Sequence, residues 1–405
     1  MAANQSDLLV IGAGPAGAAA AIEGRQRGLD VTVIDKASFP RDKCCGDGLT
    51  AGALRHLDQL GLDPARVPSW KVVNDVHITA PNGRSRMFPL PRDNGQFAAI
   101  ARRRELDAAL VDLARAGGAR VLEQTSLEAI SPSADRVTVR AGGTTFDAQF
   151  VVAADGMWSP TRRMLGLNVP DYRGEWHAFR QYFRNVSSRA ANDLMVWFDA
   201  DLLPGYIWSF PLADGSANVG FGIQRGRNHS IQQMKALWPE ILARPHVAGF
   251  LGEKAVAENR HSAWPIPARL GRSPLTAERV LFVGDAATAT DPMTGEGIGQ
   301  AIETGRLAAS VIADAGPRST NRAKATSAFE LHLTQGMVRD HALAQTLSTA
   351  LGSKAGANAA IATAGLTSWT RRNFSRWLFE DYPRAVIGTP RRWHRQVFTS
   401  PGAYR

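Results

Sequence analysis

The sequence predicts an α/β fold in which a dinucleotide-binding, Rossmann-like domain is interleaved with a mostly antiparallel sheet and followed by a helical C-terminal region. Residues 7–35 have the pattern strand, glycine-rich turn, helix, strand, which is the βαβ unit of such domains. Two further buried strands end in Asp-Gly or Gly-Asp near residues 155 and 285, and residues 176–223 between them are rich in strand-forming residues and turn signals. Roughly the last 70 residues have mainly helical patterning.

The composition is that of an ordinary globular protein. The chain has 405 residues, of which 44% are hydrophobic and 21% charged, and this length suggests two or three cooperating lobes. Apolar runs are short, so we expect no membrane span, and a strand beginning at Asp7 leaves no room for a signal peptide. The only cysteines, Cys44 and Cys45, are adjacent, which excludes a disulfide framework and zinc-site spacing. We therefore expect a protein of the reducing cytoplasm that binds no metal.

The first βαβ unit contains the turn Gly12-Ala13-Gly14-Pro15-Ala16-Gly17, which matches the GxGxxG fingerprint between a strand and an alanine-rich helix. The first glycine permits the tight turn, the second lets the backbone approach a pyrophosphate, and the third lets helix and strand pack closely. The N-terminus of the helix then faces the phosphates. Asp35 ends the second strand, 18 residues beyond Gly17, where a carboxylate can bind a ribose hydroxyl. The complete pattern predicts dinucleotide binding.

The later strands extend this sheet. A hairpin is predicted at residues 136–146 with Gly142-Gly143 as its turn, and buried strands are predicted at 150–154 and 279–283. Asp285 follows the last of these, at the ligand-binding edge of a parallel sheet, although a helix N-cap role explains an aspartate there equally well.

The helix expected to run to about residue 313 contains unusual glycines. Gly297, Gly299 and Gly305 each cost about 1 kcal/mol relative to alanine inside a helix. We therefore expect a flat ring or another backbone to approach this helix closely.

These patterns predict discontinuous domains. The dinucleotide-binding domain is expected to comprise residues 1–70, 98–165 and 277–315, the substrate domain residues 71–97 and 166–276, and the helical region residues 316–405.

The C-terminal region carries much of the positive charge. The net charge is +10, and the last 37 residues contain eight arginines against Glu380 and Asp381. On a helix, Phe374, Trp377, Leu378 and Tyr382 share one face. This face indicates either contact with an anionic membrane surface or docking on the protein's own body. Trp393 and Phe398 add further aromatic residues to the region. No nucleic-acid-binding module is recognisable.

Several motifs resemble a known superfamily. The GxGxxG turn, Arg103-x-x-Leu106-Asp107, Ala154-Asp155-Gly156 with Ser159 and Arg162, and Gly284-Asp285 resemble the para-hydroxybenzoate-hydroxylase-like flavoproteins, which have a GR2-type FAD-binding domain. Within that superfamily, the loop at residues 39–49 and the box Pro204-Gly205-Tyr206-Ile207-Trp208-Ser209-Phe210-Pro211 resemble the geranylgeranyl reductase family. The resemblance covers roughly residues 7–315, and the C-terminal region matches nothing recognisable.

The resemblance implies an FAD enzyme that hydrogenates double bonds of an isoprenoid, such as a geranylgeranyl-type lipid or a prenyl-quinone side chain. It implies hydride delivery from reduced FAD to one alkene carbon and protonation of its neighbour, with NADPH or a ferredoxin as electron donor. A peripheral position on the inner face of the membrane would suit a lipophilic substrate. The positions expected to contact the cofactor are Gly12, Gly14, Pro15, Ala16, Gly17, Asp35, Lys36, Cys45, Gly46, Arg103, Asp155, Gly156, Gly284, Asp285, Pro292, Gly295, Gly297 and Ile298.

Three aromatic residues are candidates for the substrate site. Strand alternation puts Tyr206, Trp208 and Phe210 on one face, where they form either a wall for a prenyl chain or ordinary core packing. Cys45 aligns with the family's cysteine, although Cys44 stands where that family usually has proline. Cys45, Tyr206 and Trp208 are therefore the catalytic candidates, with simple packing as the alternative for the thiol.

Two other functions use the same scaffold. A flavin monooxygenase or halogenase acting on an aromatic substrate is the main alternative, but Tyr206 and Phe210 replace the first tryptophan and the isoleucine of the halogenase WxWxIP box. A prenyl-binding carrier resembling the GDP-dissociation inhibitors would not use flavin, whereas the nucleotide-binding motifs here are intact. His56, His177, His229 and His341 have no motif around them and are expected to be ordinary residues.

Overall fold

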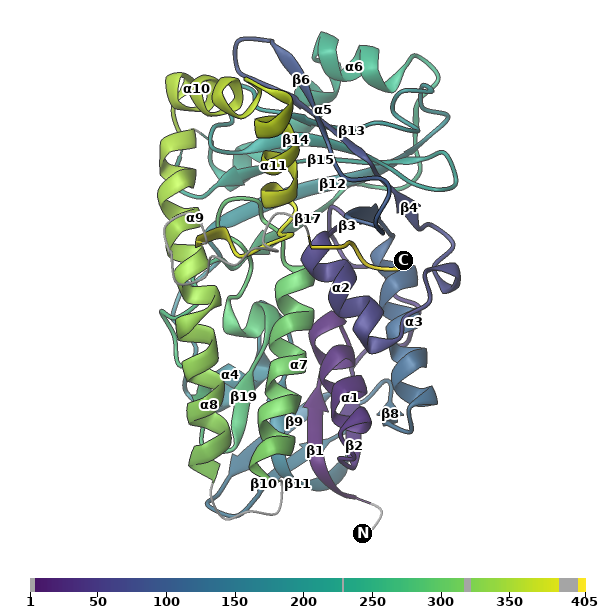
Figure 1. The fold of residues 1–405 in the computed structure, drawn as a ribbon. Helices are drawn as coiled ribbons and strands as arrows, with labels where there is room; N and C mark the ends of the chain where they lie inside the picture. The colour runs from purple at the N-terminus through teal and green to yellow at the C-terminus, as the bar shows by residue number, and fades with distance from the viewer. Residues whose placement is uncertain (1–3, 228, 317–321, 386–399) are drawn as a thin grey trace.

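The computed structural model describes residues 4–227, 229–316, 322–385 and 400–405. Two sheets form its two ends, and helices cover them and connect them (Figure 1). The mixed α/β architecture predicted from the sequence is confirmed, including the interleaving of the two sheets along the chain.

The Rossmann-like sheet has its strands in the order β18-β19-β11-β1-β2-β8, and the hairpin strands β9 and β10 extend it from β11. Strand β1 pairs in parallel with β2 on one side and with β11 on the other. The bounds of these strands are β1 Gln5–Ile11, β2 Val31–Ile34, β8 Arg120–Leu122, β9 Leu127–Pro132, β10 Val137–Ala141, β11 Thr144–Ala153, β18 Thr276–Ala277 and β19 Val280–Phe282.

One strand is longer than the sequence suggested. The second strand of the predicted hairpin and the buried strand predicted at residues 150–154 are a single strand, β11. Its first half pairs antiparallel with β10, and its second half pairs in parallel with β1 and β19. No turn residue interrupts the segment, so the chain passes from an edge hairpin into the centre of the sheet without a break.

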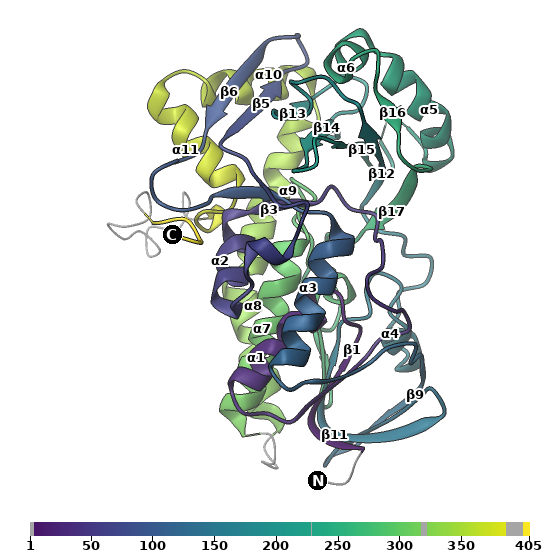
Figure 2. The same ribbon diagram turned by 90° about the vertical axis from the view of Figure 1, so that its right-hand side faces the viewer.

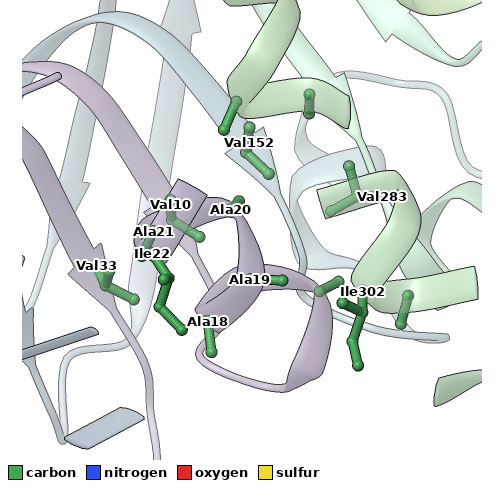
Figure 3. Close-up of a cluster of buried hydrophobic side chains, with 14 of the residues drawn as sticks. Val10, Ala18, Ala19, Ala20, Ala21, Ile22, Val33, Val152, Val283 and Ile302 are labelled. Atoms are coloured by element: carbon green, nitrogen blue, oxygen red, sulfur yellow. The ribbon is translucent and has the colours of Figure 1, made fainter. Parts of the chain in front are cut away.

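Helices pack on this sheet around a core of small side chains. Val10, Val33 and Val152 from the sheet meet the alanines of α1 and Ile302 of α7 in this cluster (Figure 3). A Cβ on Gly305 would lie 2.0 Å from the carbonyl oxygen of Ala16. The close approach of the α1 backbone therefore explains why residue 305 of α7 is a glycine. The helices of this half are α1 Pro15–Gln26, α2 Ala51–Leu60, α3 Arg103–Ala116, α4 Pro160–Met164 and α7 Ile298–Ala315, with short 3-10 turns η1 Pro64–Arg66 and η2 Gly284–Ala287.

The second sheet, called here the antiparallel sheet, has the order β16-β12-β15-β14-β13-β5-β6, with β17 also paired to β12. All its pairs are antiparallel except β13 with β5, and helices α5 and α6 lie on its outer side (Figure 2). The bounds are β5 Asp75–Thr79, β6 Ser85–Pro89, β12 Trp176–Arg184, β13 Leu194–Trp197, β14 Tyr206–Pro211, β15 Ala217–Gln224, α5 Ile231–Ala243, α6 Pro245–Leu251, β16 Val256–Ala257 and β17 Ser262–Ile266.

A small third sheet lies between the two halves. Strand β7 is its centre and pairs with β3 and β4. The bounds are β3 Gly48–Thr50, β4 Lys71–Val72 and β7 Ala98–Ile100.

The C-terminal region is helical, as predicted. Helices α8 and α9 follow one another along the length of the molecule, from the Rossmann-like sheet to the antiparallel sheet, where α10 and α11 lie (Figure 1). Their bounds are α8 Arg322–Gln335, α9 Met337–Leu351, α10 Lys354–Ala364 and α11 Ser368–Leu378. No helix in the described part of the chain is long and apolar enough to cross a membrane.

The aromatic face of α11 packs on the protein itself. The Phe374 ring lies 5.0 Å from that of Phe88 on β6, and Trp377 and Tyr382 are buried. This aromatic face therefore docks on the body of the protein, which is the second of the two interpretations. Leu366 and Trp369, at the start of α11, are instead 70% and 66% exposed. Trp393 and Phe398 lie outside the described residues.

Candidate active site

A cavity of about 800 Å³ connects the C-terminal edge of the Rossmann-like sheet with the antiparallel sheet and the C-terminal helices. Every site residue predicted from the sequence lines it except two, Gly17 and Pro292. Pro292 is buried beside the cavity. Gly17 packs against the turn, where a Cβ would lie 1.8 Å from the carbonyl oxygen of Gly12.

The glycine turn leaves the N-terminus of α1 open to the cavity. Gly14 is the N-cap of α1 and provides no side-chain hydrogen bond. Gly12 has φ +98°, and a Cβ there would lie 2.4 Å from the carbonyl oxygen of Ala154. The first turn of the helix therefore has no side-chain cap, and its residues Gly14, Pro15 and Ala16 line the cavity, which is an arrangement that suits an anion.

Two arginines add positive charge at this end of the cavity. Arg103 binds Asp107 through two nitrogen atoms, at 2.7 and 2.8 Å, and Arg41 reaches the same carboxylate at 3.1 Å. The position of a Gly14 Cβ would be 3.4 Å from the Arg41 guanidinium. Because two guanidinium groups share one carboxylate, the site keeps an excess positive charge beside the helix terminus.

Asp35 lies on the cavity at the end of β2, next to Lys36. Its carboxylate accepts hydrogen bonds from the backbone N–H groups of Ala13 and Ala37, at 2.7 and 2.8 Å. These bonds fix the carboxylate between the glycine turn and the end of the strand, where its remaining lone pairs can accept from a hydroxyl of a ligand.

The opposite rim of the cavity comes from the ends of β11 and β19. Asp155 accepts a hydrogen bond from the Thr161 N–H at 2.9 Å, and burial raises its pKa. Asp285 lies inside the one-turn helix η2, whose N-cap is Val283, so the alternative N-cap role for Asp285 is wrong. Gly297 is the N-cap of α7 on this rim and contributes no side-chain hydrogen bond.

The aromatic residues of β14 form one wall of the cavity. Tyr206, Trp208 and Phe210 follow one another with ring centroids 6.0 and 6.2 Å apart, and Ile207 between them points into the separate core under α5. Strand alternation is therefore as predicted. Gly220 on β15 pairs with Trp208 across the sheet, and its missing side chain makes room for the indole ring.

Cys45 lines the cavity close to this wall. Its Sγ accepts a hydrogen bond from the backbone N–H of Asp47 at 3.4 Å, and burial raises its pKa to about 12. The side chain is therefore a neutral thiol at physiological pH. Cys44 also lines the cavity, and burial raises its pKa as well.

A buried network holds the cysteine loop against the wall, and sequence reasoning did not find it. The Asp47 carboxylate accepts from the Tyr182 hydroxyl at 2.5 Å and from the Asn218 amide at 2.8 Å. Asn218 also donates to the Cys45 carbonyl at 2.9 Å and accepts from the Trp208 indole at 3.1 Å. Burial raises the pKa of Asp47 to about 6. Asn218 has no signal in the sequence, because Cys45 and Asp47, two of its three partners, lie more than 170 residues away along the chain.

Sequence reasoning also missed an acidic group on the cavity. Glu296 precedes α7, accepts from the Gly299 N–H at 2.8 Å, and has its pKa raised to about 8 by burial and by the nearby Glu380. Glu380 follows α11 and accepts from the Gln300 amide at 2.7 Å and the Thr50 hydroxyl at 3.1 Å. The C-terminal region therefore helps to build the site.

The C-terminal helices close the far end of the cavity with apolar side chains. The lining residues from this region are Leu347, Ala350, Leu351, Ala360, Ile361, Phe374, Trp377, Leu378 and Phe379. Within the described residues, no group of three or more His, Cys, Asp or Glu side chains is placed to hold a metal ion.

Comparison with known proteins places this site in context. The FAD binding domain family matches residues 5–321. The chain is 33% identical over 333 residues to the menaquinone reductase of Mycobacterium tuberculosis (strain ATCC 25618 / H37Rv), covering 76% of this chain and 77% of that protein. It is 32% identical over 324 residues to digeranylgeranylglycerophospholipid reductase 2 of Methanopyrus kandleri, with coverage of 76% and 77%.

Solved structures share the fold at lower identity. A geranylgeranyl bacteriochlorophyll reductase-like protein from Thermoplasma acidophilum has a TM-score of 0.78 at 22% identity, covering 95% of this chain and 98% of its own. The p-nitrophenol 4-monooxygenase PnpA from Pseudomonas putida DLL-E4 has a TM-score of 0.73 at 18% identity, with coverage of 91% and 96%. Because a reductase-like protein and a monooxygenase share the scaffold, the fold alone does not separate the two functions.

Proposed function

The chain belongs to the geranylgeranyl reductase family of FAD-dependent oxidoreductases, and from this premise we propose that it hydrogenates carbon–carbon double bonds of an isoprenoid chain. The observation that carries the proposal is the cavity of about 800 Å³, which joins the edge of the Rossmann-like sheet to an aromatic wall and to the apolar faces of the C-terminal helices.

The residues at the sheet edge fit FAD. The uncapped N-terminus of α1, with Arg41 and Arg103 beside it, suits the diphosphate, and Asp35 suits a ribose hydroxyl. Gly295 and Gly297 line the cavity just before α7 and carry no side chain, which suits the approach of the flat isoalloxazine ring. Bound there in its reduced form, FAD supplies a hydride.

The chain's own residues would bind the alkene and supply the proton. Each five-carbon isoprene unit buried against the aromatic wall and the C-terminal helices would contribute about 4 kcal/mol, at ~0.8 kcal/mol per carbon. Cys45 and Glu296 face the same cavity in their neutral forms near pH 7. Either group can therefore donate a proton to the alkene carbon next to the one that accepts the hydride.

Electron supply and membrane contact are further parts of the proposal. The reductant is NADPH or a ferredoxin, and a lipophilic substrate places the protein at the inner face of a membrane. Leu366 and Trp369, which are exposed beside Arg371 and Arg372, are the residues that we propose for that contact.

The alternative is hydroxylation or halogenation of an aromatic substrate. An anaerobic reaction separates the two functions, because a monooxygenase needs oxygen and a reductase does not. The reduced protein is mixed with a geranylgeranyl lipid or a menaquinone, with and without oxygen, and the product is weighed by mass spectrometry. A gain of two mass units per double bond without oxygen supports the reductase. Unchanged lipids, together with a flavin hydroperoxide spectrum in oxygen, refute it.

A further inference from the structure

A second cavity, of about 600 Å³, adjoins the first and shares two of its lining residues, Trp158 and Pro265. Trp158 follows β11 and is 52% exposed, which is unusual for a tryptophan. The other lining residues come from the start of β12, the end of β15 and the beginning of α5, and they are Arg173, His177, Arg225, Gly226, Arg227, His229, Ser230, Ile231 and Gln232. This second cavity is called the basic pocket below.

The lining of the basic pocket is cationic. Arg173, Arg225 and Arg227 all line it, and among the described lining residues there is no Asp or Glu. Two carboxylates act on the lining, Glu175 on Arg225 and Asp201 on His229, and both also bind other partners. Glu175 accepts from the Tyr172 hydroxyl at 2.6 Å and from the Ala268 N–H at 2.7 Å.

The second acidic neighbour, Asp201, is also engaged. Asp201 pairs with Arg244 at 2.7 Å, while His229 lies at a longer 3.6 Å from the same carboxylate. The pocket therefore keeps a surplus of positive charge.

Two features show that these cations are held near one another. The Arg225 guanidinium is fixed by the carbonyl oxygens of Gly174, at 2.9 Å, and Arg173, at 2.6 Å. Burial and the charge of Arg173 lower the pKa of Arg225, and burial together with Arg225 lowers the pKa of His177 to about 4. Like charges at short range repel, and a multiply charged anion in the pocket would relieve that repulsion.

We propose that the basic pocket binds the phosphates of a reduced nicotinamide nucleotide, which stacks a ring on Trp158 at the junction with the flavin cavity. The pocket is large enough for part of such a ligand, its charge matches phosphates, and its shared wall leads to the place where FAD would be reduced. The nucleotide loses one hydride and becomes oxidised, and the flavin accepts that hydride. This inference rests on the proposed function, in which a two-electron donor must reduce the flavin before an alkene carbon can accept a hydride.

Direct binding tests the pocket independently of catalysis. Calorimetry measures NADP⁺ binding to the oxidised, FAD-loaded protein in three forms. These are the wild type, a pocket variant with both Arg173→Gln and Arg227→Gln, and a control variant with both Arg140→Gln and Arg136→Gln. The last pair removes the same charge from exposed sites on the β9–β10 hairpin, and neither residue lines the pocket. We expect the pocket variant to lose at least tenfold in affinity, with pyrophosphate competing in the wild type, and the control pair to bind as the wild type does.

A second variant separates stacking from charge. Trp158→Leu should weaken binding of NADP⁺ but leave pyrophosphate binding unchanged. Equal NADP⁺ affinity in wild type and the pocket variant would overturn the inference. So would a wild type that binds no nucleotide while a reduced acidic ferredoxin reduces its flavin. Wild type reduced with dithionite is tested with prenyl lipid in parallel, so that failure of the proposed function is seen separately from failure of the pocket.

Discussion

Replacing Gly220 by alanine should displace the Trp208 indole and remove the activity without removing the flavin. A Cβ at position 220 would lie 2.3 Å from Cζ2 of Trp208 and 2.3 Å from the carbonyl oxygen of Phe179, whereas ordinary contact begins at 3.4 Å. Either the ring or the β12–β15 pairing must therefore move by about 1 Å. We expect overpacking to cost about 1–3 kcal/mol of stability, and a shift of this size at a reacting site to lower the rate roughly 10²-fold.

Gly222 is the matched control. It lies on the same strand two residues further along, also on the cavity, and its nearest contact with an added Cβ would be 3.8 Å. Both variants are assayed for bound flavin, melting temperature and prenyl reduction at saturating donor. Gly222→Ala should stay within about threefold of wild type. If Gly220→Ala behaved like Gly222→Ala, the positioning of Trp208 by the strand would not matter, and the reasoning would be refuted.

Three other changes have definite expected outcomes. Glu296 is neutral below its raised pKa of about 8, so proton donation by this residue should fall as the pH rises through about 8. Glu296→Gln should abolish that decline in the pH–rate profile. An unchanged profile would exclude Glu296 as the acid. Asp35→Asn should weaken FAD binding about tenfold, because a charged hydrogen bond worth roughly 1.4 kcal/mol is lost. The release of flavin from the protein measures this effect. A variant that retains FAD as the wild type does would contradict the ribose contact. Gly305→Ala would place a Cβ 2.0 Å from the Ala16 carbonyl oxygen and should lower the melting temperature by several degrees. Gly249→Ala in α6, with open space around it, should leave the melting temperature unchanged. Equal melting temperatures for the two variants would refute the packing argument.

The parts of the fold that depend on local patterns could be predicted from the sequence. The strand, glycine turn and helix at the N-terminus follow from residue types within one short segment, and the structure has them at β1 and α1. The alternation of Tyr206, Trp208 and Phe210 is also local, since a strand has a fixed period of two. In both cases the chemistry and the geometry are set by neighbours in sequence.

The parts built from distant segments could not be predicted. Asn218 contacts Asp47 across 171 residues, and the pKa of Glu296 is raised by burial and by Glu380, which lies in a region without a recognisable motif. His177 was expected to be an ordinary residue, and it lines the basic pocket with Arg173 from its own segment and with Arg225 and Arg227 from the end of β15. Apolar residues at helical spacing in α9–α11 indicate burial, but nothing in that spacing distinguishes a core from a substrate cavity.

An anaerobic single turnover tests the central claim most directly. The FAD-loaded protein is reduced with one equivalent of dithionite, mixed with a geranylgeranyl lipid or a menaquinone, and followed by flavin absorbance and mass spectrometry of the lipid. The proposed function predicts that each reoxidised flavin corresponds to one double bond reduced, with a gain of two mass units. Flavin that stays reduced, beside lipid of unchanged mass, would contradict it.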